Sequence, residues 1–166
     1  MIPMEPTTVH STFVVEHHYP YSPEKVFAAF SDPARKRRWY AEGEANDVEQ
    51  YEMDFRVGGE ERLRYHFRPG HPIEGQVITN QARIQDIVPN QRVVSAQTMT
   101  LQDLTRQEKR LFSALVTLEF VPSADGTDLI CTNQGAFYEA AGPDFSKMIE
   151  QGWRSMLDKI EQVLGQ

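Results

Sequence analysis

Cysteine is nearly absent from this chain of 166 residues, which contains only Cys131. One cysteine cannot form an internal disulfide and supplies no metal-binding pair, and this usage is typical of a reducing compartment. Free cysteine is among the most buried residue types, so we expect Cys131 to act as a small apolar residue on a strand. We expect a cytoplasmic protein, because residues 1–10 lack the charged-then-apolar order of a signal peptide.

Excess positive charge and long apolar runs are missing as well. The formal net charge is −7, whereas binding to nucleic-acid phosphates needs a surplus of lysine and arginine. The one basic run, residues 35–38, is too short to change this, and we expect it to face solvent. No stretch approaches the ~20 apolar residues of a membrane span. We therefore expect neither a nucleic-acid partner nor a membrane span.

The short motifs of common catalytic and metal sites are also lacking. No nucleophile elbow, phosphate loop or dinucleotide fingerprint occurs. The five histidines do not stand at the spacing of a helical zinc motif, so we expect no metal and no cofactor. An enzyme would have to assemble its site from scattered side chains, and the sequence leaves open whether the protein is one.

What is present is the composition of one globular domain. Hydrophobic residues make up 40% and charged residues 25% of the chain, close to the averages for globular domains. A chain of this length is about the size of one domain. We expect a flexible N-terminal segment at residues 1–10 and a single domain at residues 11–166.

Apolar spacing divides this domain into helices and strands. Ser22-Pro23 and Asp32-Pro33 each place a capping side chain before a proline. This pattern predicts two short helices after a first strand near residues 13–17. The period then changes to two, which predicts strands at residues 48–57, 62–67, 75–88, 92–101, 112–120 and 129–137. The polar residues 102–110 are either a loop or a wide hairpin connection.

A long amphipathic helix is predicted after Gly142-Pro143-Asp144. Its apolar residues, from Ile149 to Leu164, form one broad stripe. At ~1.5 Å per residue, a helix of this length measures about 30 Å and can cross the whole sheet. The fold class is therefore α+β, a curved antiparallel sheet of six to seven strands wrapped on one helix. A single helix cannot fill all the space beneath such a sheet, so we expect a cavity.

Several short motifs resemble, in their order and spacing, those of a known family. They are Ser22-Pro23-Glu24-Lys25-Val26-Phe27 with Asp32-Pro33 and Trp39, the segments 53–59 and 87–94, Gly126-Thr127-Asp128-Leu129 and Gly152-Trp153. Over residues 11–164 the sequence resembles the START/birch-pollen-allergen (SRPBCC) superfamily and, within it, homologues of the activator of heat-shock protein 90 ATPase.

This resemblance implies a helix-grip fold and a cavity used for lipids, hormones and polyketides, and in some branches for cyclisation or hydrolysis. It also implies a connection with the stress response. The co-chaperone role that names the family belongs to longer proteins with an additional N-terminal module.

Our leading hypothesis is that a small hydrophobic or aromatic molecule binds between the sheet and the C-terminal helix. The candidate ligand-binding residues combine aromatic rings, adaptable methionines and a few orienting polar groups. They are Trp39, Tyr51, Phe55, Tyr65, Phe67, Met99, Asn133, Phe137, Met148, Trp153 and Met156. The alternative is that these residues are ordinary core side chains, with the tyrosine hydroxyls at the rim and the asparagine bonded to backbone or buried water.

Two other functions stay open at this point. One is a cyclase, lyase or hydrolase acting on an aromatic or polyketide-like substrate, with Tyr51, Tyr65 or Asn133 polarising a carbonyl. The other is a chaperone-accessory interaction module that uses a sheet edge or the acidic surface. A homodimer formed through a sheet edge or an exposed helix face is compatible with each of these functions.

Overall fold

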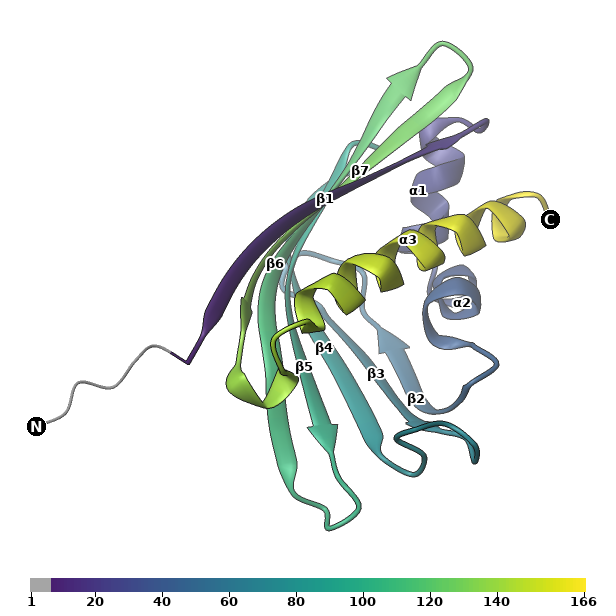
Figure 1. Cartoon of the computed structure of the whole chain (residues 1–166). Coiled ribbons are helices and arrows are strands. Elements are labelled where there is room, and N and C mark those ends of the chain that lie inside the picture. The colour runs from purple at the N-terminus through teal and green to yellow at the C-terminus, as the bar shows by residue number, and fades with distance from the viewer. Residues whose placement is uncertain (1–6) are drawn as a thin grey trace, which may run out of the picture.

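Seven antiparallel strands form one curved sheet within residues 7–166, the part of the chain that the structure describes. The computed structural model places two short helices after the first strand and one long helix after the last (Figure 1). The strands are β1 (Val9–Tyr19), β2 (Asn46–Met53), β3 (Glu60–Phe67), β4 (Val77–Val88), β5 (Arg92–Gln102), β6 (Glu108–Ser123) and β7 (Gly126–Phe137). The helical elements are α1 (Pro23–Ser31), α2 (Pro33–Lys36), the π-helical turn η1 (Arg37–Ala41), the 3-10 turn η2 (Glu139–Ala141) and α3 (Phe145–Leu164).

The strand order is β1-β7-β6-β5-β4-β3-β2. The edge strand β1 therefore pairs with the last strand, β7, and strands β2 to β7 lie side by side in the order of the sequence. Helix α3 lies across the concave face of the sheet, and its C-terminal half runs close to α1 and η1 (Figure 1). The structure thus confirms the predicted α+β helix-grip fold.

The two short helices begin where the capping pattern predicts. The Ser22 hydroxyl accepts a hydrogen bond from the backbone N–H of Lys25 at 3.3 Å, and the Asp32 carboxylate accepts one from Ala34 at 3.0 Å. A proline occupies the first helical position in each case, where its missing N–H costs no hydrogen bond. Helix α2 then widens into η1, which ends at Ala41. A π-helical turn of this kind often marks a functional site.

Several strand boundaries differ from the prediction, and the differences at β2 and β6 have a clear physical cause. Strand β2 ends at Met53 instead of residue 57, because the chain turns there and the N–H of Asp54 bonds to the carbonyl of Glu60 at 2.9 Å. Val57 lies in this turn and is 56% exposed, so the alternation of apolar residues continues beyond the end of the strand.

Strand β6 begins earlier than predicted, at Glu108 instead of residue 112. The Asp103 carboxylate accepts hydrogen bonds from the backbone N–H groups of Thr105 and Gln107, at 2.9 and 3.0 Å. These bonds close a short hairpin loop at residues 103–107. The outer residues at the start of β6 are polar, and for this reason the sequence pattern did not reveal the strand.

The N-terminal boundary can be compared only in part. Residues 1–6 of the segment predicted to be flexible lie outside the described residues. Val9 and His10, from the end of that segment, belong to β1 and pair with β7.

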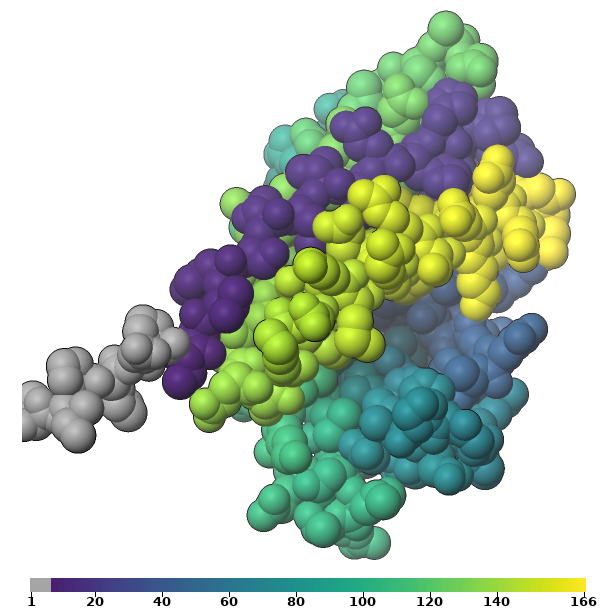
Figure 2. All heavy atoms as spheres, viewed as in Figure 1, coloured from purple at the N-terminus to yellow at the C-terminus, as the bar shows by residue number. Residues whose placement is uncertain are grey.

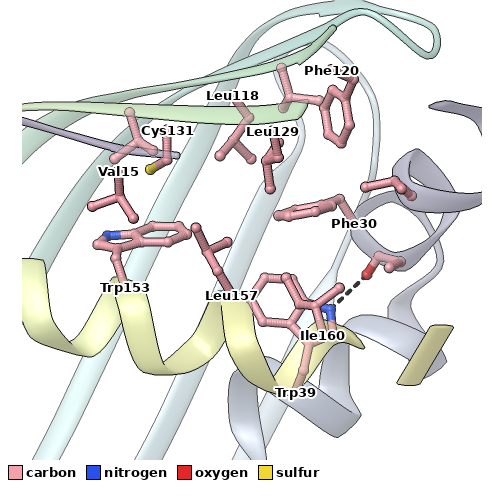
Figure 3. Packing of buried hydrophobic residues seen from close by; sticks show 14 of the residues in the cluster. Val15, Phe30, Trp39, Leu118, Phe120, Leu129, Cys131, Trp153, Leu157 and Ile160 are labelled. Carbon is pink, nitrogen blue, oxygen red and sulfur yellow. Dashed lines mark hydrogen bonds between the residues drawn. The ribbon is translucent and has the colours of Figure 1, made fainter. Parts of the chain in front are cut away.

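The main core lies between α3 and the concave face of the sheet. Trp153 and Leu157 point from α3 toward Val15 and Cys131 (Figure 3), and all four side chains are buried. The hydroxyl of Tyr19 also donates a hydrogen bond to the backbone carbonyl of Leu157 at 2.7 Å, which fixes α3 to β1.

Cys131 is fully buried, as predicted, and burial raises the pKa of its thiol to about 12. The thiol therefore stays neutral at ordinary pH and behaves as a small apolar group. Across residues 7–166, the helices are too short or too polar to cross a membrane.

Candidate functional site

A cavity of about 330 Å³ lies between the sheet and helix α3. Its floor follows from the strand register, which aligns four side chains in one row across β3, β4, β5 and β6. The pairs in this row are Leu63 with Asn80, Asn80 with Met99, and Met99 with Phe112. Side chains in such a row point to the same face of a sheet. All four line the cavity.

The walls of the cavity come from η1 and α3. Trp39 and Tyr40 contribute from η1, while Ile149, Trp153 and Met156 contribute from α3. These last three residues are separated by four and three positions, so they share one helix face. In the space-filling view, a recess opens between the yellow helix α3 and the blue-to-teal part of the chain (Figure 2).

Trp39 serves the core and the cavity at once. Its indole N–H donates a hydrogen bond to the backbone carbonyl of Ala29 at 2.8 Å (Figure 3). Its ring meets that of Phe30 edge to face, with the ring centroids 4.9 Å apart. The side chain is 1% exposed. The tryptophan is therefore a rigid part of the cavity wall.

The cavity has a polar side formed by phenols and amides. Burial raises the pKa of Tyr65 to about 12. Burial also raises the pKa of Tyr40, the charge of Glu61 raises it further, and a side-chain hydrogen bond with Asn80 opposes the rise. Both phenols are therefore protonated near neutral pH and can donate hydrogen bonds. Within residues 7–166 the Tyr65 hydroxyl has no protein hydrogen-bond partner, so its donor remains available to a ligand.

A buried ion pair between α2 and β3 lies next to η1. The Lys36 ammonium lies 2.7 and 2.8 Å from the two carboxylate oxygens of Glu61, and the Tyr51 hydroxyl donates to the same carboxylate at 2.7 Å. The side chains of Lys36 and Glu61 are only 13% and 5% exposed. The ammonium also lies 4.8 Å from the centre of the Tyr40 ring. These contacts join the end of α2 to β3 and hold the wall in place.

Five of the predicted ligand-binding residues line the cavity together. They are Trp39, Tyr65, Met99, Trp153 and Met156. The structure brings them from η1, β3, β5 and α3, elements that are far apart in the sequence. Whether these residues bind a ligand stays a prediction.

Three predicted residues from β2, β3 and the turn between them lie beside the cavity. The Tyr51 hydroxyl is bonded to Glu61. Phe55 lines a separate small pocket of about 20 Å³, and Phe67 stacks on His71 with the ring centroids 4.2 Å apart. These contacts give each residue a structural role.

The remaining three predicted residues do not line the cavity. Phe137 is buried against Phe112. Asn133 is 1% exposed and its side-chain amide has no hydrogen-bond partner within the described residues, but it lies farther along β7, where it pairs with Val116. Met148 is 63% exposed on α3 and does not line the cavity.

Sequence reasoning missed several lining residues, namely Tyr40, Asn80, Gly152, Ser155 and Lys159. Gly152 and Lys159 could have been found, because they lie three positions from Ile149 and Met156 on the same helix face. Asn80 sits at an inner position between the apolar residues of β4, where a polar residue was easily overlooked. Across residues 7–166, no group of three or more histidine, cysteine, aspartate or glutamate side chains could hold a metal ion.

A curved antiparallel sheet that grips one long helix, with a cavity between them, defines the helix-grip class of α+β proteins. The chain belongs to the family described as Activator of Hsp90 ATPase homolog 1-like protein, whose sequence model matches residues 20–165, and through it to the SRPBCC superfamily. Proteins with this fold typically bind ligands. No curated protein matches the chain.

Solved structures show the same fold over nearly the whole chain. An uncharacterized protein from Rhizobium leguminosarum is 32% identical, with a TM-score of 0.80 over 95% of this chain and 96% of that one. A Rhizobium loti protein is 39% identical, with a TM-score of 0.80 over 95% and 99% of the two chains. A Chromobacterium violaceum protein, at 23% identity and a TM-score of 0.71 over 92% and 96%, is similar in fold alone.

Proposed function

We propose that this protein binds a small hydrophobic or aromatic molecule in the cavity between β3–β6, η1 and α3. The observation that carries the proposal is the composition of the cavity wall, in which two tryptophans and two methionines face about 330 Å³ of space. The family context agrees with it, because ligand binding is typical of the fold.

The size of the cavity suits a small ligand. Ligand pockets commonly measure ~300–1,000 Å³, so this cavity stands at the lower end of that range. One water molecule occupies about 30 Å³ of liquid, so the space corresponds to roughly eleven waters. We therefore expect a ligand of about a dozen non-hydrogen atoms, with one or two rings or a short acyl chain.

The side chains of the wall suit an apolar body with one hydrogen-bond acceptor. Trp39 and Trp153 line the wall with the small parts of their rings that are not packed in the core, at 1% and 6% exposure, and the methionines adapt to irregular shapes. The Tyr65 hydroxyl can donate to a carbonyl or ether oxygen of the ligand. A donor of this kind would orient the ligand, because a buried polar group without a partner costs free energy.

The same geometry leaves one candidate residue for a catalytic function. Of the three residues considered for polarising a carbonyl, only Tyr65 lines the cavity. General acid–base catalysis works best when the pKa of the group is near the working pH, whereas the pKa of Tyr65 is raised to about 12. This phenol is suited to binding a carbonyl and poorly suited to moving protons. The chaperone-accessory role stays a prediction, and pull-down from cell lysate would test it.

Replacement of Gly152 tests the proposal. Gly152 lines the cavity, and a Cβ at this position would meet no atom within 4 Å. Gly152→Leu places a side chain at the cavity while removing the cost of glycine in a helix, about 1 kcal/mol. We expect the variant to fold with equal or greater stability and to lose most binding of small aromatic and acyl compounds, measured by thermal shift and native mass spectrometry.

Gly152→Ala is the matched control, because it gives the same gain in helix propensity and fills little of the cavity. We expect this variant to bind as the wild type does. Unchanged binding in the leucine variant, or no binding of any compound by the wild type, would contradict the proposal.

A further inference from the structure

Lys159 stands at the mouth of the cavity. The lining residues Glu42, Gly152 and Ser155 are exposed, so they mark the opening. Lys159 is half-buried among them. Its ammonium donates a hydrogen bond to the backbone carbonyl of Glu42, the residue that follows η1. The lysine thus reaches from α3 across the opening to the opposite wall.

The carboxylates near Lys159 lie against other side chains. Asp158 and Glu161, its neighbours on α3, lie 3.4 and 3.5 Å from the imidazole nitrogens of His17 on β1. The Glu42 carboxylate lies 3.4 Å from the guanidinium of Arg37. In the part of the chain that the structure describes, the Lys159 ammonium forms no ion pair within 4 Å and bonds only to a carbonyl.

The cationic side chains of residues 35–38, on α2 and η1, do not line the cavity. The Lys36 ammonium is bonded to Glu61, and the Arg38 guanidinium donates to the side chain of Gln166. A lysine ammonium has three donors, and the carbonyl of Glu42 uses one of them. Lys159 therefore brings a positive charge with two further donors to the rim of an apolar cavity.

We infer that the ligand is an aromatic or apolar carboxylic acid whose carboxylate binds Lys159 at the mouth while its apolar body lies between Trp39 and Trp153. This inference rests on the proposed function and specifies the ligand class for the same site. A charge-assisted hydrogen bond from an ammonium to a carboxylate is stronger than one between neutral groups. The pair lies at the opening, where water still solvates it, so the charge is not buried without compensation.

Other charge states fit this mouth less well. A cationic ligand would face the ammonium of Lys159 while the Glu42 carboxylate is already held by Arg37. Among the described residues that line the cavity, a dianion would meet one cation, Lys159, on a chain with a net charge of −7. The polar side of the cavity is lined by neutral phenols and amides, which can bind an uncharged oxygen of the ligand but supply no counter-charge.

The test compares acids with their neutral amides, which have nearly the same shape. Wild-type protein is titrated with benzoate, 2-naphthoate and octanoate and with the three corresponding amides, and binding is followed by isothermal titration calorimetry. We expect the best acid to bind about tenfold more tightly than its amide. The preference should shrink as salt is raised from 50 to 500 mM, because salt screens the charge pair.

Three variants identify the source of this preference. Lys159→Gln is expected to weaken acid binding about tenfold and amide binding far less, because the amide has no charge that loses its partner, whereas Lys159→Arg retains the charge and the preference. Lys147→Gln is the matched control, since Lys147 is exposed on the first turn of the same helix and does not line the cavity. Amide binding that is retained in Lys159→Gln also shows that the wall itself has not moved.

The possible failures are distinguishable. If acids and amides bind the wild type equally, or if Lys159→Gln keeps the acid preference, the inference on Lys159 is refuted while the proposed function stands. If no compound of either series binds the wild type, both fall together.

Discussion

Replacing Glu61 by glutamine is expected to destabilise the protein by about 3 kcal/mol, because the Lys36 ammonium then stays buried without a counter-charge. The carboxylate is 5% exposed and lies 2.7 Å from that ammonium. Removing one partner of a buried ion pair typically costs ~3–5 kcal/mol. We expect the lower end of this range, because the lysine is 13% exposed and glutamine can still accept the bond from Tyr51.

A second variant separates the cost of breaking the buried pair from the cost of losing an ordinary surface charge. Glu60, on the same strand, pairs with Arg83 at 2.6 Å, but both side chains are more than half exposed. Exposed pairs are worth ~0–1 kcal/mol, so Glu60→Gln should cost less than about 1 kcal/mol. The two variants change the net charge equally at adjacent positions. Their difference therefore reports the burial of the pair.

The assay is urea unfolding at pH 7, followed by circular dichroism, for Glu61→Gln, Lys36→Met and the double variant. Methionine has a similar length to lysine and carries no charge, so the double variant should lie within about 1 kcal/mol of the wild type. A cost below about 1 kcal/mol for Glu61→Gln would refute the reasoning. A double variant that shows the full sum of the two single costs would refute it as well.

Two further predictions concern packing and pH. In Gly135→Ala, the new Cβ would lie 2.6 Å from the Phe137 ring, which packs against the rings of Phe112 and Phe145. We expect the variant to lose about 1–3 kcal/mol of stability in urea unfolding. A neutral effect would show that the ring can move. The hydrogen bond to Asp128 raises the pKa of the His18 imidazole above 6.5 in the folded protein. The contribution of this pair to stability is therefore complete below the pKa of histidine in the unfolded chain. It disappears as the pH rises through the higher pKa of the folded state. The NMR titration midpoint of His18 should fall in Asp128→Asn, and an unchanged midpoint would contradict this assignment.

The fold could be predicted because its signals are local. Proline after Ser22 and Asp32 indicates helix starts, and alternation indicates strands, since both patterns follow from backbone geometry. The predicted boundaries were wrong where the local pattern of apolar residues does not follow the secondary structure. Val57 continues an alternation through a turn, and the polar outer face at Glu108 conceals a strand that the neighbouring strand stabilises.

The candidate site could be predicted only in part. The broad stripe of α3 revealed Trp153 and Met156, whereas Asn80 and Tyr40 lie in the cavity because of strand register and of the wide turn of η1. Neither can be read from spacing alone. The role of Lys159 depends on which carboxylates its neighbours engage, and this is a property of the folded surface.

The pairing of β1 with β7 also has a consequence for biosynthesis. Val9 pairs with Phe137 and Tyr19 with Thr127, so β1 leaves the ribosome more than a hundred residues before β7, its neighbour in the described sheet, is made. Such distant pairing slows folding, and an unpaired strand is prone to wrong association in the meantime. During synthesis, β1 therefore stays without its partner for longer than any other strand of the described sheet.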